Sequence, residues 1–198
     1  LAQIDSIRAT VEQPWSFVMV NNLRPEGALY RALMAKGEKT GRPPRFGAVE
    51  HGVEIELPGS WEAARGQWNE NRRRTMGKRY ERLRSEHGAE FEDIRAPADV
   101  DRGLEEAFHV AEKSWQGRNN SSIASSSSSR EFYRRVCKVF AERDRLNLAI
   151  LRAEGKAISY HLGLADRETL YSLKWGYDTD WKAFGAGVIS IGESIRAA

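Results

Sequence analysis

Cysteine is almost absent from this sequence. Cys137 is the single cysteine among 198 residues, so no internal disulfide can form. It lies within the apolar face of a predicted helix, where a free thiol is most often a packed structural side chain. A chain that does not depend on disulfides suits a reducing compartment, and we expect a cytoplasmic location.

Long hydrophobic runs are also missing. No stretch approaches the ~20 apolar residues that cross a bilayer, so we expect no membrane span. The first residues lack the basic and apolar regions of a signal peptide. The four histidines and the one cysteine show no metal-ligand spacing, and we therefore expect no metal.

The composition is that of a folded domain. Hydrophobic residues make up 40% and charged residues 30% of the chain, a mixture that can bury a core and excludes global disorder. The formal net charge of +3 favours anionic ligands but is too small to indicate nucleic acid by itself. The length suits one domain, or one domain and part of another.

Apolar periodicity and turn residues predict the elements of the first half of the chain. Ser60 is the expected N-cap of a long helix that runs to about Glu86 and stops at Gly88. The other expected elements are a buried strand at 16–22, a helix from Pro25 to about Met34, a polar loop at 36–44, a half-buried strand at 49–57, a strand at 90–95 and a helix at 97–115.

The serine-rich segment at 119–129 is the one region of low complexity. Its composition is typical of a flexible linker or mobile lid, and a loop that contacts substrate is the alternative. An amphipathic helix at 130–143 follows. Three strands at 146–152, 157–164 and 169–175, joined by short turns, then predict an antiparallel meander, and a helix at 187–196 closes the chain.

A glycine-rich turn lies between the last predicted strand and the last helix. Its residues, Lys182-Ala183-Phe184-Gly185-Ala186-Gly187, have the form basic-x-x-Gly-x-Gly. Glycines let the backbone approach an anion, and the free N–H groups at a helix start point at it. The pattern therefore predicts a phosphate cradle. An ordinary turn before a helix would have the same sequence pattern and is the alternative.

The meander, the glycine-rich turn and the helix together resemble the cofactor-binding half of the GNAT acyltransferase superfamily. The resemblance implies an α/β (α+β) fold with a mixed, largely antiparallel sheet flanked by helices. It also implies acetyl-CoA or another acyl-CoA as co-substrate, with its pyrophosphate on the turn. Lys182 stands where that family usually has Gln or Arg.

A closer resemblance covers roughly residues 55–198. It looks like the CelD-like branch linked to bacterial cellulose and exopolysaccharide synthesis, although Gly185-Ala186-Gly187 replaces that branch's usual Ser-Pro-Gly. The segments that carry this resemblance are Leu57–Trp61, Asn71–Arg74, Arg79–Leu83, Glu90–Glu92, Glu112–Gly117, Phe132–Arg134, Gly155–Tyr160, Leu170-Tyr171 and Gly176–Asp178.

That branch normally has two GNAT-like halves in a longer chain. The resemblance therefore implies that residues 1–54 are the end of a preceding half and that 55–198 form an acyltransferase domain. We expect the final strands of this second half to lie beyond Ala198.

The resemblance also assigns roles to individual residues. A backbone N–H of the strand at 169–175 would polarise the thioester carbonyl, as an oxyanion hole does. The expected cofactor-binding residues are Leu173, Trp175, Lys182, Phe184, Gly185, Ala186, Gly187 and Val188.

Candidates for the chemistry and for acceptor binding are fewer. Tyr177 and Asp178 precede the turn and are candidate catalytic residues; an aromatic ring packed over the turn is the plainer interpretation of Tyr177. His161 is a candidate general base, or simply a hydrogen-bonded strand histidine. Trp115 and Tyr160 are candidate substrate contacts, and a tryptophan packed at a helix end is the alternative for Trp115.

Residues 60–87 hold eight Lys and Arg against four Glu. Such a helix can be a solvated face, a contact for phosphate or nucleotide groups, or a surface for tRNA as in the Fem-type aminoacyl transferases. The leading hypothesis is acyl transfer from acyl-CoA to an amine, for example on an amino sugar or polysaccharide precursor. The alternatives are an aminoacyl-tRNA-dependent transferase and a nucleic-acid-binding module.

Overall fold

The computed structural model describes residues 20, 23, 25–46, 53–119, 121–166 and 168–197. The chain divides into two compact units, residues 1–56 and 57–198. Of the strand predicted at 16–22, only Val20 is described, and it belongs to no element; His51 also lies outside the described residues.

The first unit contains the helix α2 (Ala28–Thr40). It continues six residues beyond the predicted end at Met34, so the polar loop predicted at 36–44 is wrong over its first half. The helix stops where Gly41 adopts a left-handed conformation, with φ of 67°. The strand predicted at 49–57 is also wrong over its described part, because Val53, Ile55 and Leu57 are exposed and pair with no described strand.

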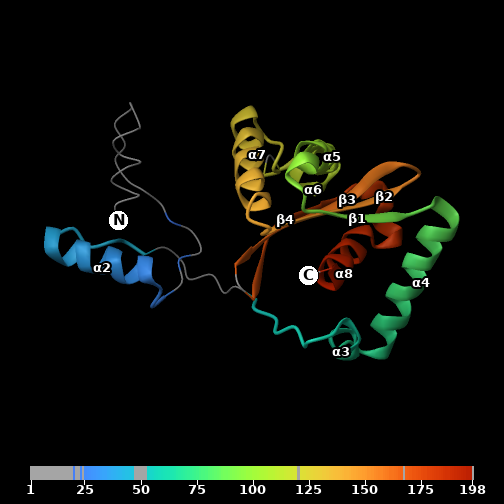
Figure 1. Cartoon of the computed structure of the whole chain (residues 1–198), viewed down its shortest axis with the longest axis horizontal. Helices are drawn as coiled ribbons and strands as arrows, with labels where there is room; N and C mark the ends of the chain where they lie inside the picture. Colours follow the sequence, from blue (N-terminus) through green and yellow to red (C-terminus); the bar gives the residue numbers. More distant parts are fainter. Residues whose placement is uncertain are drawn as a thin grey trace. The chain divides into compact units, whose positions relative to one another are not determined.

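The second unit is built on an antiparallel sheet of four strands in the order β1-β2-β3-β4 (Figure 1). The strands are β1 (Glu90–Ile94), β2 (Leu146–Ala153), β3 (Lys156–Asp166) and β4 (Thr169–Tyr177). The meander predicted for the last three strands is confirmed. Glu154 and Gly155 both have positive φ, which is the two-residue turn that matches the twist of a hairpin.

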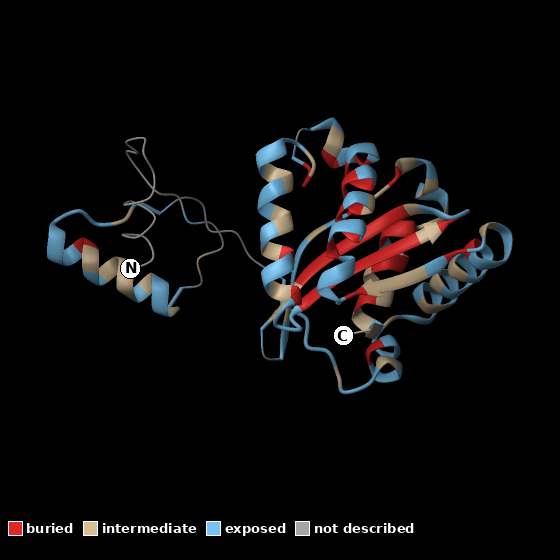
Figure 2. Ribbon diagram, turned by 45° about the horizontal axis from the view of Figure 1, so that its top comes forward, coloured by how far each residue is buried: buried red, intermediate tan, exposed pale blue. Residues whose placement is uncertain are grey.

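Helices cover both faces of this sheet (Figures 1 and 2). On one face lie α5 (Val100–Lys113), α6 (Trp115–Arg118) and α7 (Ser127–Ala141); on the other lie α4 (Glu70–His87) and α8 (Ala186–Ala197). Each face has its own apolar core, one around Phe108 and Tyr160 and one around Leu83 and Ile189. The predicted mixed fold with a flanked antiparallel sheet is thereby confirmed.

Cys137 is fully buried in the first of these cores, as the sequence predicts. Burial raises the pKa of its thiol to about 12, so the side chain stays protonated and packs as a small apolar group.

The long helix predicted from Trp61 is in fact two helices. A short helix, α3 (Trp61–Gly66), is capped by the Ser60 hydroxyl, which accepts a hydrogen bond from the Ala63 amide. The Asn69 side chain then accepts from Arg72 N–H at 2.8 Å and starts α4 afresh. Gly66 weakens the helix and Asn69 offers a competing cap, so the chain turns between them. The predicted stop at Gly88 is confirmed by its φ of 58°.

The serine-rich segment is more ordered than its composition predicts. Ser126 caps α7 by accepting from the Ser129 amide, so the last serines form the first helical turn. Ser122 and Ile123 are buried against the core. Serine is a poor helix interior residue but a strong N-cap, and a serine run before an amphipathic helix therefore starts that helix.

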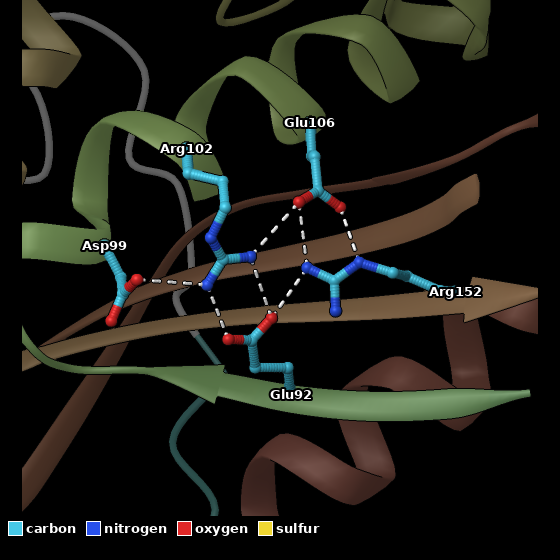
Figure 3. Close-up of polar contacts among 5 residues, drawn as sticks. All are labelled: Glu92, Asp99, Arg102, Glu106 and Arg152. Carbon is cyan, nitrogen blue, oxygen red and sulfur yellow. Dashed lines mark hydrogen bonds and ion pairs between the residues drawn. The ribbon is translucent and has the colours of Figure 1, made fainter. Parts of the chain in front are cut away.

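A network of alternating charges ties α5 to the first two strands (Figure 3). Arg102 and Arg152 both contact Glu92, each with a shortest distance of 2.6 Å. The Arg152 guanidinium also donates two hydrogen bonds to Glu106, at 2.7 and 2.9 Å. Hydrogen bonding from Arg102 holds the pKa of Glu92 at about 2, below its ordinary value of 4.5.

We expect Leu83→Ala to lower the free energy of unfolding by about 2–5 kcal/mol. Leu83 is the one fully buried residue of α4, so its truncation leaves a cavity under the helix. Urea unfolding measures the change. Val139→Ala on the exposed face of α7 is the control and should change stability by less than about 0.5 kcal/mol. Equal effects of the two substitutions would contradict this account of the core.

Glu92→Gln should remove a pH-dependent part of the stability. Because the pKa of Glu92 is lowered by folding, its ionised form stabilises the protein fully above about pH 4.5, and this contribution disappears as the pH falls towards 2. The urea midpoint of Glu92→Gln should therefore lie below that of the parent at neutral pH and converge on it in acid. Glu131→Gln, which breaks an exposed pair with Arg135, should show neither effect.

Candidate active site

The segment after β4 carries the glycine-rich turn. A short 3₁₀ helix, η2 (Thr179–Phe184), leads from Asp178 into Gly185. The Gly185 amide donates to the Lys182 carbonyl at 3.0 Å, and Gly185 adopts a left-handed conformation with φ of 71°. This conformation strains other residues, so the glycine is required for α8 to begin at Ala186.

The first turn of α8 is suited to an anion. The Val188 and Ile189 amides donate to the Gly185 carbonyl. The amides of Ala186 and Gly187 have no acceptor among the described residues, and the first turn contains no acidic side chain. Free N–H groups at the positive end of a helix favour an anion, and the phosphate cradle at this turn stays a prediction.

Gly187 also has a packing role that the sequence does not reveal. A Cβ atom at this position would lie 2.8 Å from Tyr177 Cδ1 and 3.2 Å from Trp175 Cζ3. These two rings from β4 stack on each other, with centroids 6.4 Å apart. The glycine therefore lets α8 rest directly on the aromatic pair of β4.

Cations surround the turn from two elements. Lys182 is exposed on η2, as the motif implies. From α4, the Arg79 guanidinium lies 3.2 Å from where a Gly185 Cβ would stand, and the Arg82 guanidinium lies over the Phe184 ring, 5.0 Å from its centroid. The basic helix thus turns part of its charge toward the glycine-rich turn. The sequence predicts a basic helix here but not the place of Arg79 beside the turn, because only the antiparallel packing of α4 on α8 brings the two together.

The outer strand β4 has an irregularity beside the turn. Its pairing with β3 shifts between Leu162 and Gly163, so Leu173 is an extra residue of β4. Leu173, Trp175 and Val188 are all more than one third exposed, and the Trp175 ring lies against Gly187 in the first turn of α8. Of the predicted cofactor-binding residues of β4, Trp175 is therefore the one placed against the turn.

His161 lies on the face of the sheet that α8 covers. It pairs across the sheet with Trp175 and is only 3% exposed. Its Nε2 lies 2.8 Å from the Ser172 hydroxyl, while Nδ1 has no partner among the described residues. Burial lowers its pKa to about 4, so the ring is neutral at physiological pH.

Asp178 and Tyr177 have different surroundings. Asp178 is buried, caps η2 by accepting from the Asp180 amide, and lies 3.3 Å from the Lys113 ammonium. Tyr177 is half-buried against Gly187 at the start of the turn. Of the candidate catalytic residues, Tyr177 therefore lies nearest the anion site, and Asp178 has a structural partner of its own.

The two candidate substrate contacts lie on the other face. Tyr160 is fully buried in the core around Phe108, its hydroxyl is 3.4 Å from Gln116 Oε1, and burial raises its pKa. Trp115 is 44% exposed at the start of α6. The structure does not bring either residue to the glycine-rich turn.

Two absences apply to the described part of the chain. No group of three or more His, Cys, Asp or Glu side chains there could hold a metal ion. None of its helices has the length and apolar character needed to cross a membrane.

A family model described as an acetyltransferase (GNAT) domain matches residues 70–198. No curated protein matches the chain. Among solved structures, a conserved protein of unknown function from Bacteroides thetaiotaomicron is similar, with 18% identity and a TM-score of 0.45 over 70% of this chain and 45% of that chain. This chain thus spans less than half the length of that protein. The family match covers more than half of the chain and includes all four strands, the glycine-rich turn and α8, so the chain belongs to the GNAT acetyltransferase family.

Proposed function

We propose that this chain binds acetyl-CoA, or a related acyl-CoA, and transfers the acyl group directly to an amine. Acyl transfer is the general chemistry of the family. The observation that carries the proposal is the anion site at the turn, where left-handed Gly185, the free amides of Ala186 and Gly187, and Arg79 converge. A pyrophosphate is the group that such a site fits best.

The remaining contacts follow from the position of that anion. The pantetheine arm would lie along the exposed apolar side chains of Leu173, Trp175 and Val188. A backbone N–H freed by the bulge at Leu173 would donate to the thioester carbonyl oxygen. The amine nitrogen attacks the carbonyl carbon, the C–S bond breaks, and the thiolate leaves with the electron pair of that bond.

Two proton transfers accompany this exchange. The attacking amine loses its proton to solvent, and the departing thiolate takes one from an acid on the protein, which solvent then reprotonates. We assign the second transfer to the Tyr177 hydroxyl, because Tyr177 lies at the start of the turn and against Gly187. His161 is a weak candidate base at neutral pH, since burial holds its pKa near 4 and its Nε2 already pairs with Ser172.

The acceptor follows from the resemblance to the CelD-like branch rather than from a described pocket. We propose an amine on a saccharide or polysaccharide precursor, acted on in the cytoplasm, with residues 55–198 as the acyltransferase domain. The aminoacyl-tRNA alternative has no described feature in its favour beyond the basic helix, part of whose charge is turned toward the glycine-rich turn.

Calorimetric titration with acetyl-CoA tests the cofactor site. The parent should bind saturably, and Arg79→Ala combined with Lys182→Ala should weaken binding at least tenfold, because two charge-assisted contacts to phosphate are lost. Arg74→Ala on the same helix is the matched control, because Arg74 forms no ion pair with any described residue. Its affinity should stay within about twofold of the parent.

If the folded parent does not bind acetyl-CoA, the proposal is contradicted. The same titration would then be repeated with aminoacyl-tRNA. Equal losses in the double variant and in Arg74→Ala would show a diffuse charge effect instead of a site at the turn. The losses should also shrink at high salt, because the contacts are partly exposed.

Tyr177→Phe tests the assignment of the proton donor. We expect kcat for acetyl transfer to an amino-sugar acceptor to fall about 100-fold or more, while the affinity for acetyl-CoA changes little, because the ring that packs on Gly187 is kept. Steady-state kinetics and calorimetry on the same preparation separate the two effects. An unchanged kcat would remove Tyr177 from the chemistry.

A further inference from the structure

A buried histidine and an exposed serine meet at the outer strand of the sheet. His161 of β3 is 3% exposed, and its Nε2 atom lies 2.8 Å from the hydroxyl oxygen of Ser172 on β4. Ser172 itself is exposed. It directly precedes Leu173, the extra residue of the β4 bulge. The pair therefore joins the inside of the sheet to the place where the thioester carbonyl is proposed to lie.

The surroundings of the imidazole ring indicate which nitrogen carries its proton. Burial lowers the pKa of His161 to about 4, so the ring is neutral at physiological pH and has a single N–H. Nδ1 is buried and has no hydrogen-bond partner among the described residues. A proton on Nδ1 would leave a buried N–H without an acceptor, which is rare in folded proteins. A proton on Nε2 has the Ser172 oxygen as its acceptor and leaves only a lone pair on Nδ1.

This tautomer determines what the serine hydroxyl can do. A hydroxyl oxygen has two lone pairs and carries one proton. When Nε2–H donates to the Ser172 oxygen, one lone pair is used and the O–H group stays free to donate. Since the imidazole occupies the buried side of the hydroxyl, the O–H group turns to the open edge of β4. Ser172 is thus held as an outward hydrogen-bond donor.

The same contact argues against a serine nucleophile activated by His161. Such a pair needs the serine O–H to donate to a bare Nε2, and a third group usually orients the imidazole through its other nitrogen. None of the described residues bonds to Nδ1. A ring with a pKa of about 4 is also a poor proton acceptor at neutral pH. The donor role is therefore the one that the geometry favours.

We propose that Ser172 is a second hydrogen-bond donor to the thioester carbonyl oxygen, beside the backbone N–H of the Leu173 bulge, and that His161 is the positioning residue that orients it. The inference rests on the proposed acyl transfer. Negative charge develops on that oxygen while the amine attacks the carbonyl carbon, and an oriented donor stabilises this charge. When the C–S bond breaks, the C=O double bond forms again and Ser172 keeps its proton.

Steady-state kinetics of acetyl transfer to an amino-sugar acceptor test the role of the serine. Ser172→Ala should lower kcat about 100-fold, while calorimetry finds an affinity for acetyl-CoA within about twofold of the parent. Ser172→Thr keeps a hydroxyl and should retain most of the activity. Thr169→Ala, which removes an exposed hydroxyl from the same strand, is the matched control and should change neither quantity. An unchanged kcat in Ser172→Ala would overturn the proposal.

Two variants of His161 separate a positioning residue from a base. A glutamine side chain has an N–H that can replace Nε2–H but cannot take up a proton, so His161→Gln should keep kcat within about fivefold of the parent. His161→Leu should lose about as much as Ser172→Ala, and the double variant should lose little more, because both substitutions remove the same oriented donor. Equal large losses in the two His161 variants, with acetyl-CoA affinity kept, would identify a base and overturn the proposal.

Mass spectrometry of the parent mixed with acetyl-CoA alone tests the nucleophile alternative. Ser172 should remain unmodified. An acetyl group on Ser172 that forms and disappears during turnover would overturn the donor role.

Nitrogen-15 NMR of the parent reads the tautomer without any substrate. The His161 ring, assigned by the loss of its signals in His161→Gln, should carry its proton on Nε2 at neutral pH. A proton on Nδ1 would overturn the inference even in a protein that transfers acetyl groups. If the proton is on Nε2 but the folded parent does not bind acetyl-CoA, the proposed function fails first, and the catalytic role of Ser172 fails with it.

Discussion

The contact between Gly187 and the stacked rings of Trp175 and Tyr177 positions the rest of the site. A side chain at this one point would push α8 away from β4. Because the helix rests on the sheet here, its first amides lie beside the bulge of β4, and its outer side is free to accept α4. The proposed anion site therefore depends on this close approach.

Charge is divided between the two faces of the sheet. Over α5, the arginines of the Glu92 network are matched by carboxylates within the protein and serve the fold (Figure 3). On α4 the arginines outnumber their partners, and the helix is held mainly by Leu83 and by aromatic contacts of His87 with Trp181 and Phe184. Unmatched positive charge therefore gathers along the helix that borders the turn, where an anionic donor would be bound.

Sequence patterns predicted the sheet and the turn well, because both depend on local signals. The meander at 146–177 consists of apolar strands separated by short turns, and Gly185 of the glycine-rich turn needs the left-handed conformation that glycine adopts freely. The break between α3 and α4 was not predicted, because an asparagine inside a run of helix-forming residues is only a weak sequence signal for a new N-cap. In the structure, Asn69 is that N-cap. The place of Arg79 beside Gly185 was not predictable, since it depends on which residues of a distant element pack against it. Burial of His161 and Tyr160 was likewise hidden, because an alternating strand does not reveal which helix covers each face.

β4 and β1 are the two edge strands of the described sheet, and they differ in how readily each could pair with a further strand. β1 is five residues long and carries Glu90, Glu92 and Asp93, which discourage a neighbour. β4 is nine residues long and displays Tyr171, Leu173 and Trp175. A strand added from the same polypeptide or from another would therefore dock at β4, next to the Leu173 bulge. Extension of the sheet would then also cover the exposed apolar side chains of β4.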